Sequence, residues 1–292
     1  MIKIFYHSAD FDGKASAAIV HQYCIIKRKP AWLIGINYGY DFKESVLSEL
    51  ISGDEIYVVD FSFTPEEFKI LKEKTKSITW IDHHKTIIEN KNYEDLKIPG
   101  IRFDGQKAAC ELTWEYLFPT SECPLGIKLL SWYDIWAHYL DERILPFQYG
   151  LRIYNTDVIK GKKEIWDPIL FQDNSFISKI VEEGKIVLRY IEQEFKEYAK
   201  VYSYETIFEG LKILVCNRGK AGFKLFDSVF DPIKHDAVIT FVYHNGGWNF
   251  SMYSSKKEID CSKIAKKYGG GGHKSACGWR MNKLPAEFLN SL

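Results

Sequence analysis

Three short apolar segments, each followed at once by acidic or histidine side chains, constrain the fold of this chain most. They are residues 2–6, 56–60 and 78–81, and the stretches between them carry helical patterns, including one over residues 14–28. Another helix start is predicted at Thr64-Pro65-Glu66-Glu67, because threonine caps helices and proline fits the first turn. Strands that alternate with helices predict a parallel α/β sheet.

The polar residues that follow these strands are expected to meet at one edge of the sheet. They are His7, Asp10, Asp12, Asp60, Asp82, His83 and His84. In an open α/β sheet, ligands gather beyond the carboxyl ends of the strands. Carboxylates suit hard divalent cations, and imidazole shifts the preference toward Mn²⁺ and other transition ions. For the Asp10–Asp12 pair and for Asp60, each taken alone, helix capping is the alternative.

The segment Asp82-His83-His84 carries the most weight, because three consecutive ligand-capable residues are an unusual end for a core strand. A single histidine is more often structural, whereas two behind an aspartate at an acidic edge favour a functional site. Asp134 lies in the aromatic segment Trp132–Trp136. It is either a buried, hydrogen-bonded carboxylate or a ligand that completes a second metal site.

A second region with a different pattern follows residue 204. Residues 175–202 have apolar side chains at helical spacing, which is typical of a packed connecting helix. Strands are predicted at 211–216, 237–243 and 248–253, with a hairpin turn at residues 244–247, and a short helix at 261–267. The glycines at 269–272 and His273 are typical of a backbone nest for an anion, with a flexible linker as the alternative. We therefore expect domains at 1–172 and 205–292, joined by a helix at 173–204.

Composition excludes some classes of function. The 39 basic and 39 acidic residues balance, so a protein that coats long nucleic acid by neutralising many phosphates is not expected. No leader pattern and no apolar run of membrane-spanning length is seen, and a cytoplasmic location is predicted. The six cysteines form no C-x-x-C pair, which favours reduced thiols.

Five segments resemble the motifs of the DHH phosphoesterase superfamily in the right order. Four are Asp10-Phe11-Asp12-Gly13, Val59-Asp60-Phe61-Ser62, Asp82-His83-His84 and Tyr133-Asp134, and the fifth, residues 268–278, resembles the phosphate-holding motif of the DHHA1 domain. The resemblance implies a parallel-sheet DHH domain joined by a long helix to a smaller α/β DHHA1 domain. It also implies an active site in the cleft between the two domains.

The family implies two divalent metal ions, usually Mn²⁺, with Mg²⁺ as the alternative. Carried over by position, one ion would be held by His7, Asp10 and Asp60, and the other by Asp12, Asp60, His83 and Asp134. A water molecule shared by the ions would attack phosphorus in line. His84 would stabilise the phosphoryl oxygens or assist the leaving group, and Asp82 would orient a histidine.

The family also implies that Gly270, Gly271, Gly272 and His273 of the second domain bind substrate. Two further candidates come from this sequence itself, Tyr253 and Arg218, the latter in a glycine-containing loop. Tyr253 would stack on a base and Arg218 would contact a phosphate, although solvated surface charge is the alternative for Arg218. The chain departs from the family in two places. His7 lies three residues before Asp10, where small-nucleotide phosphatases place a histidine four before, and Tyr253-Ser254 stands where many DHHA1 domains have Arg-Ser.

The resemblance and the neutral charge favour hydrolysis of short RNA or dinucleotides to 5′-mononucleotides, as in oligoribonuclease-type members. The enzyme alternatives are a 3′-phosphoadenosine 5′-phosphate phosphatase, a cyclic-dinucleotide phosphodiesterase and, least favoured, a processive single-strand DNA exonuclease. The glycine-rich tail disfavours inorganic pyrophosphatase. A nucleotide-sensing or RNA-binding module is the non-enzyme alternative, and the complete ligand set speaks against it. The oligomeric state stays open, a homodimer included.

Overall fold

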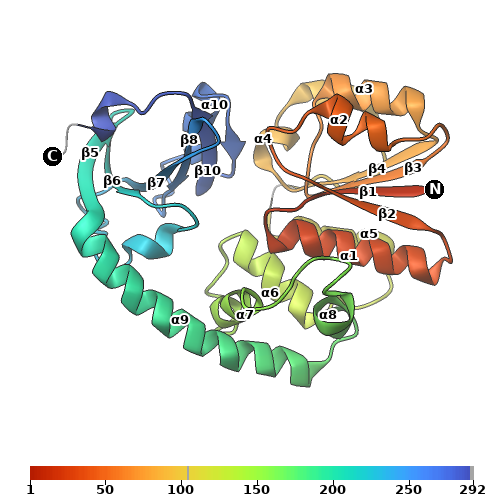
Figure 1. Ribbon diagram of the computed structural model, residues 1–292, viewed down its shortest axis with the longest axis horizontal. Coiled ribbons are helices and arrows are strands. Elements are labelled where there is room, and N and C mark those ends of the chain that lie inside the picture. Colours follow the sequence, from red (N-terminus) through yellow and green to blue (C-terminus); the bar gives the residue numbers. More distant parts are fainter. Residues whose placement is uncertain (104, 290–292) are drawn as a thin grey trace. The chain divides into compact units, whose positions relative to one another are not determined.

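The computed structural model describes residues 1–103 and 105–289, and the chain divides into two compact units, Met1–Leu188 and Arg189–Leu292. Figure 1 shows the elements in chain order. The boundary between the units falls within helix α9 (Asn174–Tyr202). None of the described helices is long and apolar enough to cross a membrane.

Within the described residues, the first unit contains a four-stranded parallel sheet with the strand order β2-β1-β3-β4. Its strands are β1 (Ile2–His7), β2 (Ala31–Ile36), β3 (Glu55–Val59) and β4 (Ser77–Ile81). Its helices are α1 (Phe11–Ile26), α2 (Phe42–Ser45), α3 (Pro65–Lys74), α4 (Lys85–Ile88), α5 (Ala109–Leu117), α6 (Leu125–Asp134), α7 (Ile144–Leu151) and α8 (Asp167–Leu170). The predicted parallel α/β sheet is confirmed.

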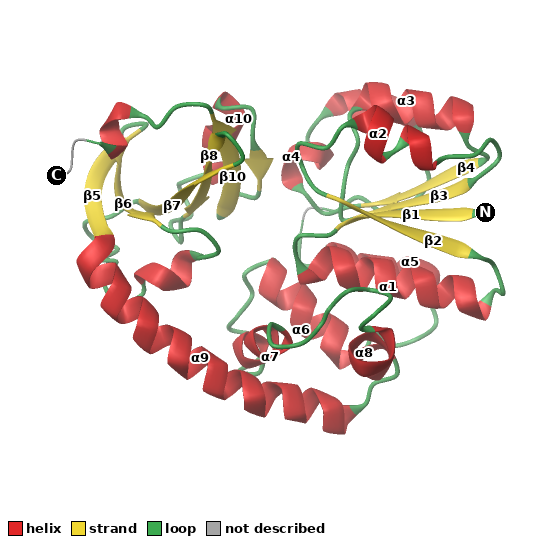
Figure 2. Cartoon of the chain, in the orientation of Figure 1, coloured by secondary structure: helices red, strands yellow, loops and turns green. Residues whose placement is uncertain are grey.

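Both faces of this sheet are covered, which explains why its strands are nearly continuous apolar runs. Helices α1 and α5 lie on one face, and α2 and α3 lie on the other (Figure 2). Helix α3 begins as predicted: Thr64 and Glu67 form a capping box, and Pro65 occupies the first turn.

One local expectation in the first unit was wrong, and one strand was missed. Helix α1 begins at Phe11 rather than Lys14, because the Asp10 side chain caps it by accepting the Gly13 N–H. Gly13 therefore lies inside the first turn of the helix. It is needed for close packing, since a Cβ there would lie 1.9 Å from the carbonyl oxygen of His7. The edge strand β2 was not predicted.

The second unit contains a six-stranded sheet, within the described residues, with the order β5-β6-β7-β8-β10-β9. Its strands are β5 (Ser203–Phe208), β6 (Leu211–Asn217), β7 (Ala237–His244), β8 (Gly247–Tyr253), β9 (Gly271–Gly272) and β10 (Ala276–Met281). Only the β6–β7 pair is parallel among these described pairings. The predicted strands at 211–216, 237–243 and 248–253 are confirmed to within a residue, whereas β5 and β10 were missed.

Turn chemistry places the hairpin between β7 and β8. Asn245 and Gly246 have φ values of 48° and 78°, which is the left-handed pair that a two-residue hairpin turn requires. Helix α10 (Cys261–Lys267) has the predicted bounds. It belongs to the core cluster that includes Met252 and Trp279, whereas the last turns of α9 belong to a separate cluster with Leu214 and Val238.

Candidate metal centre

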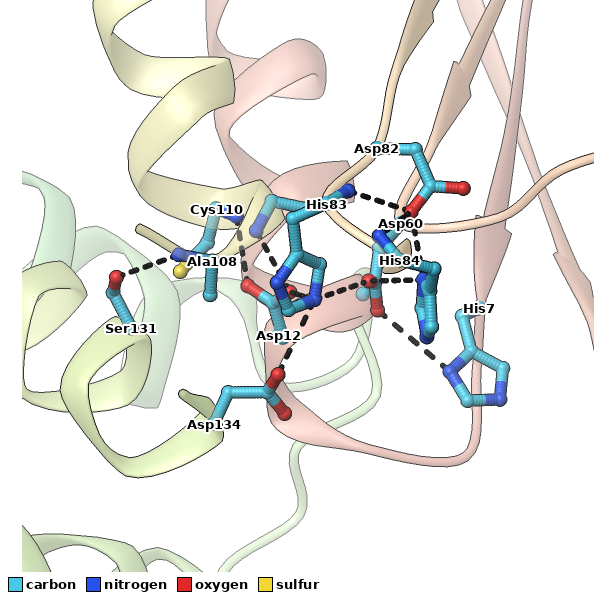
Figure 3. Close-up of polar contacts among 12 residues, drawn as sticks. His7, Asp12, Asp60, Asp82, His83, His84, Ala108, Cys110, Ser131 and Asp134 are labelled. Carbon is cyan, nitrogen blue, oxygen red and sulfur yellow. Dashed lines mark hydrogen bonds and ion pairs between the residues drawn. The ribbon is translucent and has the colours of Figure 1, made fainter. Parts of the chain in front are cut away.

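In the sheet of the first unit, β2 and β3 lie on opposite sides of β1, and predicted ligands follow the carboxyl ends of its strands. The chain connections run in opposite directions from β1, toward β2 and toward β3, and ligands bind beyond the carboxyl ends of strands at such a switch point. His7 ends β1, Asp60 directly follows β3, and Asp82 directly follows β4. Figure 3 shows these side chains gathered at this edge, with Asp60 between His83 on one side and His7 and His84 on the other.

Asp60 is the centre of the cluster. Its side chain is 2% exposed, and its backbone has a φ of 51°, a left-handed conformation that aspartate tolerates better than most residues. Its Oδ2 lies 3.7 Å from His7 Nδ1 and its Oδ1 lies 3.5 Å from His83 Nε2. Within the described part of the chain, Oδ1 is buried without a hydrogen-bond partner. Since a buried carboxylate oxygen without a hydrogen bond is costly, this atom fits a position next to a cation.

One group of ligand atoms consists of His7, Asp10 and Asp60, whose ligand atoms lie within 4.8 Å of one another. His7 Nδ1 is 2.8 Å from Asp10 Oδ2, and Asp10 Oδ1 accepts the Gly13 N–H at 3.0 Å. Asp10 therefore caps helix α1 and also belongs to this group of possible ligand atoms. The two interpretations of Asp10, a helix cap or a ligand, are compatible because its two oxygens point to different partners.

A second group consists of Asp12, Asp60 and His83, again within 4.8 Å. His83 Nε2 lies 3.4 Å from Asp12 Oδ2 and 3.2 Å from Asp134 Oδ2. Asp134 is the last residue of α6 and thus reaches the sheet edge from a separate element. The two groups share Asp60, and each combines carboxylate and imidazole atoms, which are ligands that divalent cations accept.

The start of α5 holds Asp12 in place, a feature that the sequence interpretation missed. Asp12 Oδ2 accepts the Ala109 N–H at 2.9 Å, and Oδ1 accepts the Cys110 N–H at 2.7 Å. The N-cap residue of α5 is Ala108, which has no side-chain acceptor of its own. A helix needs acceptors for its first N–H groups, so Asp12 supplies the missing cap from a distant segment. An apolar helical pattern that lacks a capping residue was the available signal.

Asp82 orients His84 rather than entering either of these two groups. Its Oδ1 accepts the N–H groups of His83 and His84 at 2.7 and 3.0 Å, and lies 2.7 Å from His84 Nδ1. Its Oδ2 accepts the Ser62 hydroxyl. Asp60, Asp82 and His84 also form a further group of possible ligand atoms within 4.8 Å of one another. His84 Nδ1 is also 3.9 Å from Asp60 Oδ1, so His84 lies at the border of the cluster.

The cluster has an unusual distribution of charge. Burial lowers the pKa of His7, but the carboxylates of Asp10 and Asp60 outweigh burial and raise this pKa to about 11. Burial likewise opposes protonation of His83, yet Asp134 and Asp60 raise its pKa well above the usual value. Burial also opposes ionisation of Asp60, and contacts with His7 and His83 nevertheless hold its pKa far below normal. The carboxylates thus attract positive charge strongly enough to keep buried imidazoles protonated.

The segment after Asp134 is fixed by ring stacking. His138 stacks on Tyr133 and on Trp136, with centroid distances of 5.0 and 5.8 Å. Trp136 has a φ of 63°, which is rare for a bulky residue and signals a backbone held by its surroundings. This turn fixes the end of α6 and, with it, the position of Asp134.

The glycine-rich segment of the second unit does not form the predicted open nest. The Gly270 N–H donates to the Ala265 carbonyl at 2.9 Å, and the His273 N–H donates to Ala276 at 2.7 Å. Gly271 and Gly272 pair with β10. A Cβ at Gly270 would lie 2.1 Å from the Gly278 carbonyl oxygen, so close packing against β10 explains this glycine. The N–H groups of Gly270 and His273 are thus already committed.

Arg218 and Tyr253 also have partners within the second unit. The guanidinium of Arg218 forms a two-pronged ion pair with Glu194, at 2.9 Å for each contact, and packs on the Tyr198 ring. This pairing speaks against the predicted phosphate contact by Arg218. Tyr253 is half-buried against the cluster that contains Leu225.

Comparison with known proteins identifies the fold. No family model matches the chain. Among solved structures, the DHH domain of a protein described as a member of a family of ribosomal proteins aligns over 99% of this chain and 85% of its own, with a TM-score of 0.64 and 16% identity. An exopolyphosphatase-related protein from Bacteroides fragilis aligns over 99% and 89%, with a TM-score of 0.52 and 13% identity. The chain therefore has a DHH-type fold.

Three further proteins are similar to this chain, one by structure and two by sequence. A pGpG-specific phosphodiesterase from Vibrio cholerae aligns over 96% of this chain and 93% of its own, with a TM-score of 0.50 and 15% identity. Oligoribonuclease NrnB of Bacillus subtilis is 23% identical over 84% of this chain. An uncharacterized protein of Acanthamoeba polyphaga mimivirus is 24% identical over 94% of this chain. The matches span 63% and 66% of these two curated relatives, just under two thirds of their length.

Proposed function

We propose that this protein is a metal-dependent phosphodiesterase that hydrolyses short oligoribonucleotides or dinucleotides to mononucleotides, with two divalent ions, preferably Mn²⁺. The observation that carries the proposal is the shared position of Asp60. This one buried carboxylate belongs to three groups of possible ligand atoms, two of which are the groups described above, and its Oδ1 has no hydrogen-bond partner within residues 1–103 and 105–289. A pair of adjacent cations would satisfy it.

Each residue of the cluster has a part in the proposed reaction. When bound, the two ions would lower the pKa of a water molecule and neutralise charge on the phosphate. His7, Asp10 and Asp60 would hold one ion, and Asp12, Asp60, His83 and Asp134 the other. The Ala109 and Cys110 N–H groups hold the Asp12 carboxylate in place. His84, oriented by Asp82, is placed to donate a hydrogen bond to a phosphoryl or leaving-group oxygen.

The comparisons support a short nucleotide substrate. One curated relative is named an oligoribonuclease, and one fold neighbour is named a phosphodiesterase specific for the dinucleotide pGpG. The equal numbers of acidic and basic residues agree with this, because a long nucleic acid would require a basic surface. We also propose that the second unit binds substrate through His273, in a cleft between the domains, as the family resemblance implies.

The proposal is tested with a product time course. Purified protein with Mn²⁺ is given a labelled RNA dinucleotide, a 5-mer, a 24-mer and 3′-phosphoadenosine 5′-phosphate. We expect rapid loss of the dinucleotide and the 5-mer to mononucleotides, with the 24-mer largely spared. An Asp60→Asn preparation made in parallel detects any contaminating nuclease. Release of inorganic phosphate from the bisphosphate alone would replace the proposal with a small-nucleotide phosphatase, and no turnover would favour the sensing module.

A further inference from the structure

We propose that Tyr38 is a stacking platform for one nucleobase of the substrate, at the rim of the metal centre. This inference rests on the proposed function and adds which part of the substrate the chain recognises besides phosphate. It gives a role to a residue that contributes no ligand atom to the cluster.

The position of Tyr38 is the first observation. It lies in the loop between β2 and α2, at the carboxyl end of the sheet, and its ring centroid is 5.7 Å from that of His7. On the β3 side it contacts Phe61, the residue after Asp60, with centroids 5.2 Å apart. Despite these contacts, Tyr38 is 59% exposed. A large ring that touches a buried charged cluster and still presents much of its surface to solvent is suited to contact a ligand there.

The loop that carries Tyr38 is anchored on both sides. The Ser8 hydroxyl donates to Asn37 Oδ1 at 3.2 Å, which ties the loop to the end of β1. The Tyr40 hydroxyl donates to Glu67 at 2.5 Å. Gly39 has a φ of 89° with open space around it, so it provides the turn that follows Tyr38. Because these contacts hold the loop in place, ligand binding carries little entropic cost of ordering the Tyr38 ring.

Tyr38 packs on aromatic rings that belong to the buried core of the first unit. Phe61 is fully buried and contacts both Tyr40 and Phe63, with centroids 5.5 and 5.4 Å away. Phe63 in turn contacts Phe5 of β1 at 5.6 Å. The platform is thus continuous with the core of the sheet, which gives the exposed ring a fixed orientation.

A nucleobase is the ligand chemistry that fits this platform. Bases stack on aromatic side chains with little dependence on sequence, because every base has a π face. A substrate of one or two nucleotides offers few phosphates, so its affinity cannot come from neutralising many charges. A ring beside the proposed ligand His7 would hold the base of a nucleotide whose phosphate lies at the centre.

Binding of two products tests the platform independently of turnover. Calorimetric titrations with Mn²⁺ compare AMP with ribose 5-phosphate, which lacks the base. We expect the wild-type protein to bind AMP about 5- to 150-fold more tightly. Tyr38→Ala should abolish that preference and leave the ribose 5-phosphate affinity unchanged, whereas Tyr38→Phe should retain it. Tyr190→Ala, at an exposed tyrosine of α9, is the matched control and should behave as wild type.

Equal weakening of both ligands by Tyr38→Ala would show that Tyr38 only supports His7 and would overturn the inference. An unchanged AMP preference would overturn it as well, as would a wild-type protein that does not prefer AMP. Kinetics with an RNA dinucleotide separate the two proposals. If the wild type does not cleave it, the proposed function fails while the binding comparison still decides on Tyr38. If it does, Tyr38→Ala should raise KM with kcat within about twofold.

Discussion

The two ends of strand β3 carry acidic side chains in opposite surroundings. At its amino end, Glu55 lies 3.0 Å from Lys29 and 3.1 Å from Lys76, and Asp54 accepts the Ile51 N–H at 2.9 Å. At its carboxyl end, the ion pairs described for Asp60 are all with histidines, and one of its oxygens has no hydrogen-bond partner within the described residues.

This contrast separates carboxylates that stabilise the fold from one suited to bind an ion. Asp54 and Asp60 are both buried, at 3% and 1% exposed, so burial alone does not distinguish them. The partners do. A carboxylate with lysine or backbone donors is already satisfied, whereas a carboxylate that only protonated imidazoles balance is matched better by a divalent cation.

The largest expected effect comes from replacing the aspartate at each end of β3 with asparagine, one variant at a time. Asp60→Asn should lower kcat/KM for an RNA dinucleotide by about 10³-fold or more, which is ~4 kcal/mol of transition-state stabilisation, because both ions lose a shared ligand. Asp54→Asn should leave kcat/KM within about threefold and instead lower the free energy of unfolding by about 1 kcal/mol, through a weakened hydrogen bond. Steady-state kinetics and urea unfolding measure the two effects.

The stability of the metal-free proteins sharpens the same comparison. Without metal, Asp60→Asn should be less stable than wild type, because contacts with His7 and His83 hold the pKa of Asp60 far below normal and its ionised carboxylate therefore stabilises the folded state. Full activity in Asp60→Asn, or loss of activity in Asp54→Asn, would contradict the assignment of the two ends.

A smaller effect is expected where Asp82 orients His84. Asp82→Asn should lower kcat by about 10- to 100-fold, as is usual when the partner of a functional histidine is removed. Ser62→Ala should cost less, because Asp82 keeps its contacts with His83 and His84. If Asp82 acts through His84, the double variant Asp82→Asn/His84→Gln should be no slower than His84→Gln alone. Additive losses would show that the two residues act separately.

His7, which contacts Asp60 at the carboxyl end of β3, and Glu55 at its amino end should contribute to stability with opposite dependence on pH. The folded pKa of His7, about 11, exceeds its unfolded value of about 6.5, so its contribution to stability is complete below pH ~6.5 and is lost as pH rises toward 11. Lys29 and Lys76 lower the pKa of Glu55, so its contribution is present above the unfolded pKa and is lost as the pH falls through the folded pKa.

Without metal, we therefore expect the free energy of unfolding to fall by on the order of 1 kcal/mol between pH 7 and 9. Mn²⁺ should reverse this trend, because it binds the deprotonated ligands. Urea unfolding with a chelator or with Mn²⁺ measures the difference, and His7→Gln should flatten the metal-free slope. The same slope with and without Mn²⁺ would count against a metal at this edge.

The sequence was sufficient to predict those parts of the centre that depend on one rule of parallel sheets. His7, Asp60 and Asp82 follow strands whose carboxyl ends must share an edge, so their meeting could be predicted without knowing the strand order. Strand β2 could not be recognised so readily, because it is a half-exposed edge strand with a glycine near its end. The strand order, and hence the switch point, came only from the structure.

The remaining parts of the centre depend on contacts between distant segments. Asp12 is fixed by N–H groups 97 and 98 residues further along the chain, and no local pattern specifies this pairing. Asp134 reaches the centre because α6 packs beside α5, which is a matter of tertiary packing. In the second unit, the glycines did suggest close backbone approach. The neighbour is strand β10, however, and the sequence does not say whether a glycine packs on an anion or on another strand.

The hydrogen bonds between Asp12 and the start of α5 have a consequence for the order in which the new chain folds and binds an ion. During synthesis, His7, Asp10, Asp12 and Asp60 emerge well before Ala109, Cys110 and Asp134. Until α5 forms, the Asp12 carboxylate has water in place of its two N–H donors, and closing so long a loop has an entropic cost. An ion that met the nascent chain would find a loose and incomplete set of ligands. Ion capture should therefore follow the docking of α5 and report that the first unit has finished folding.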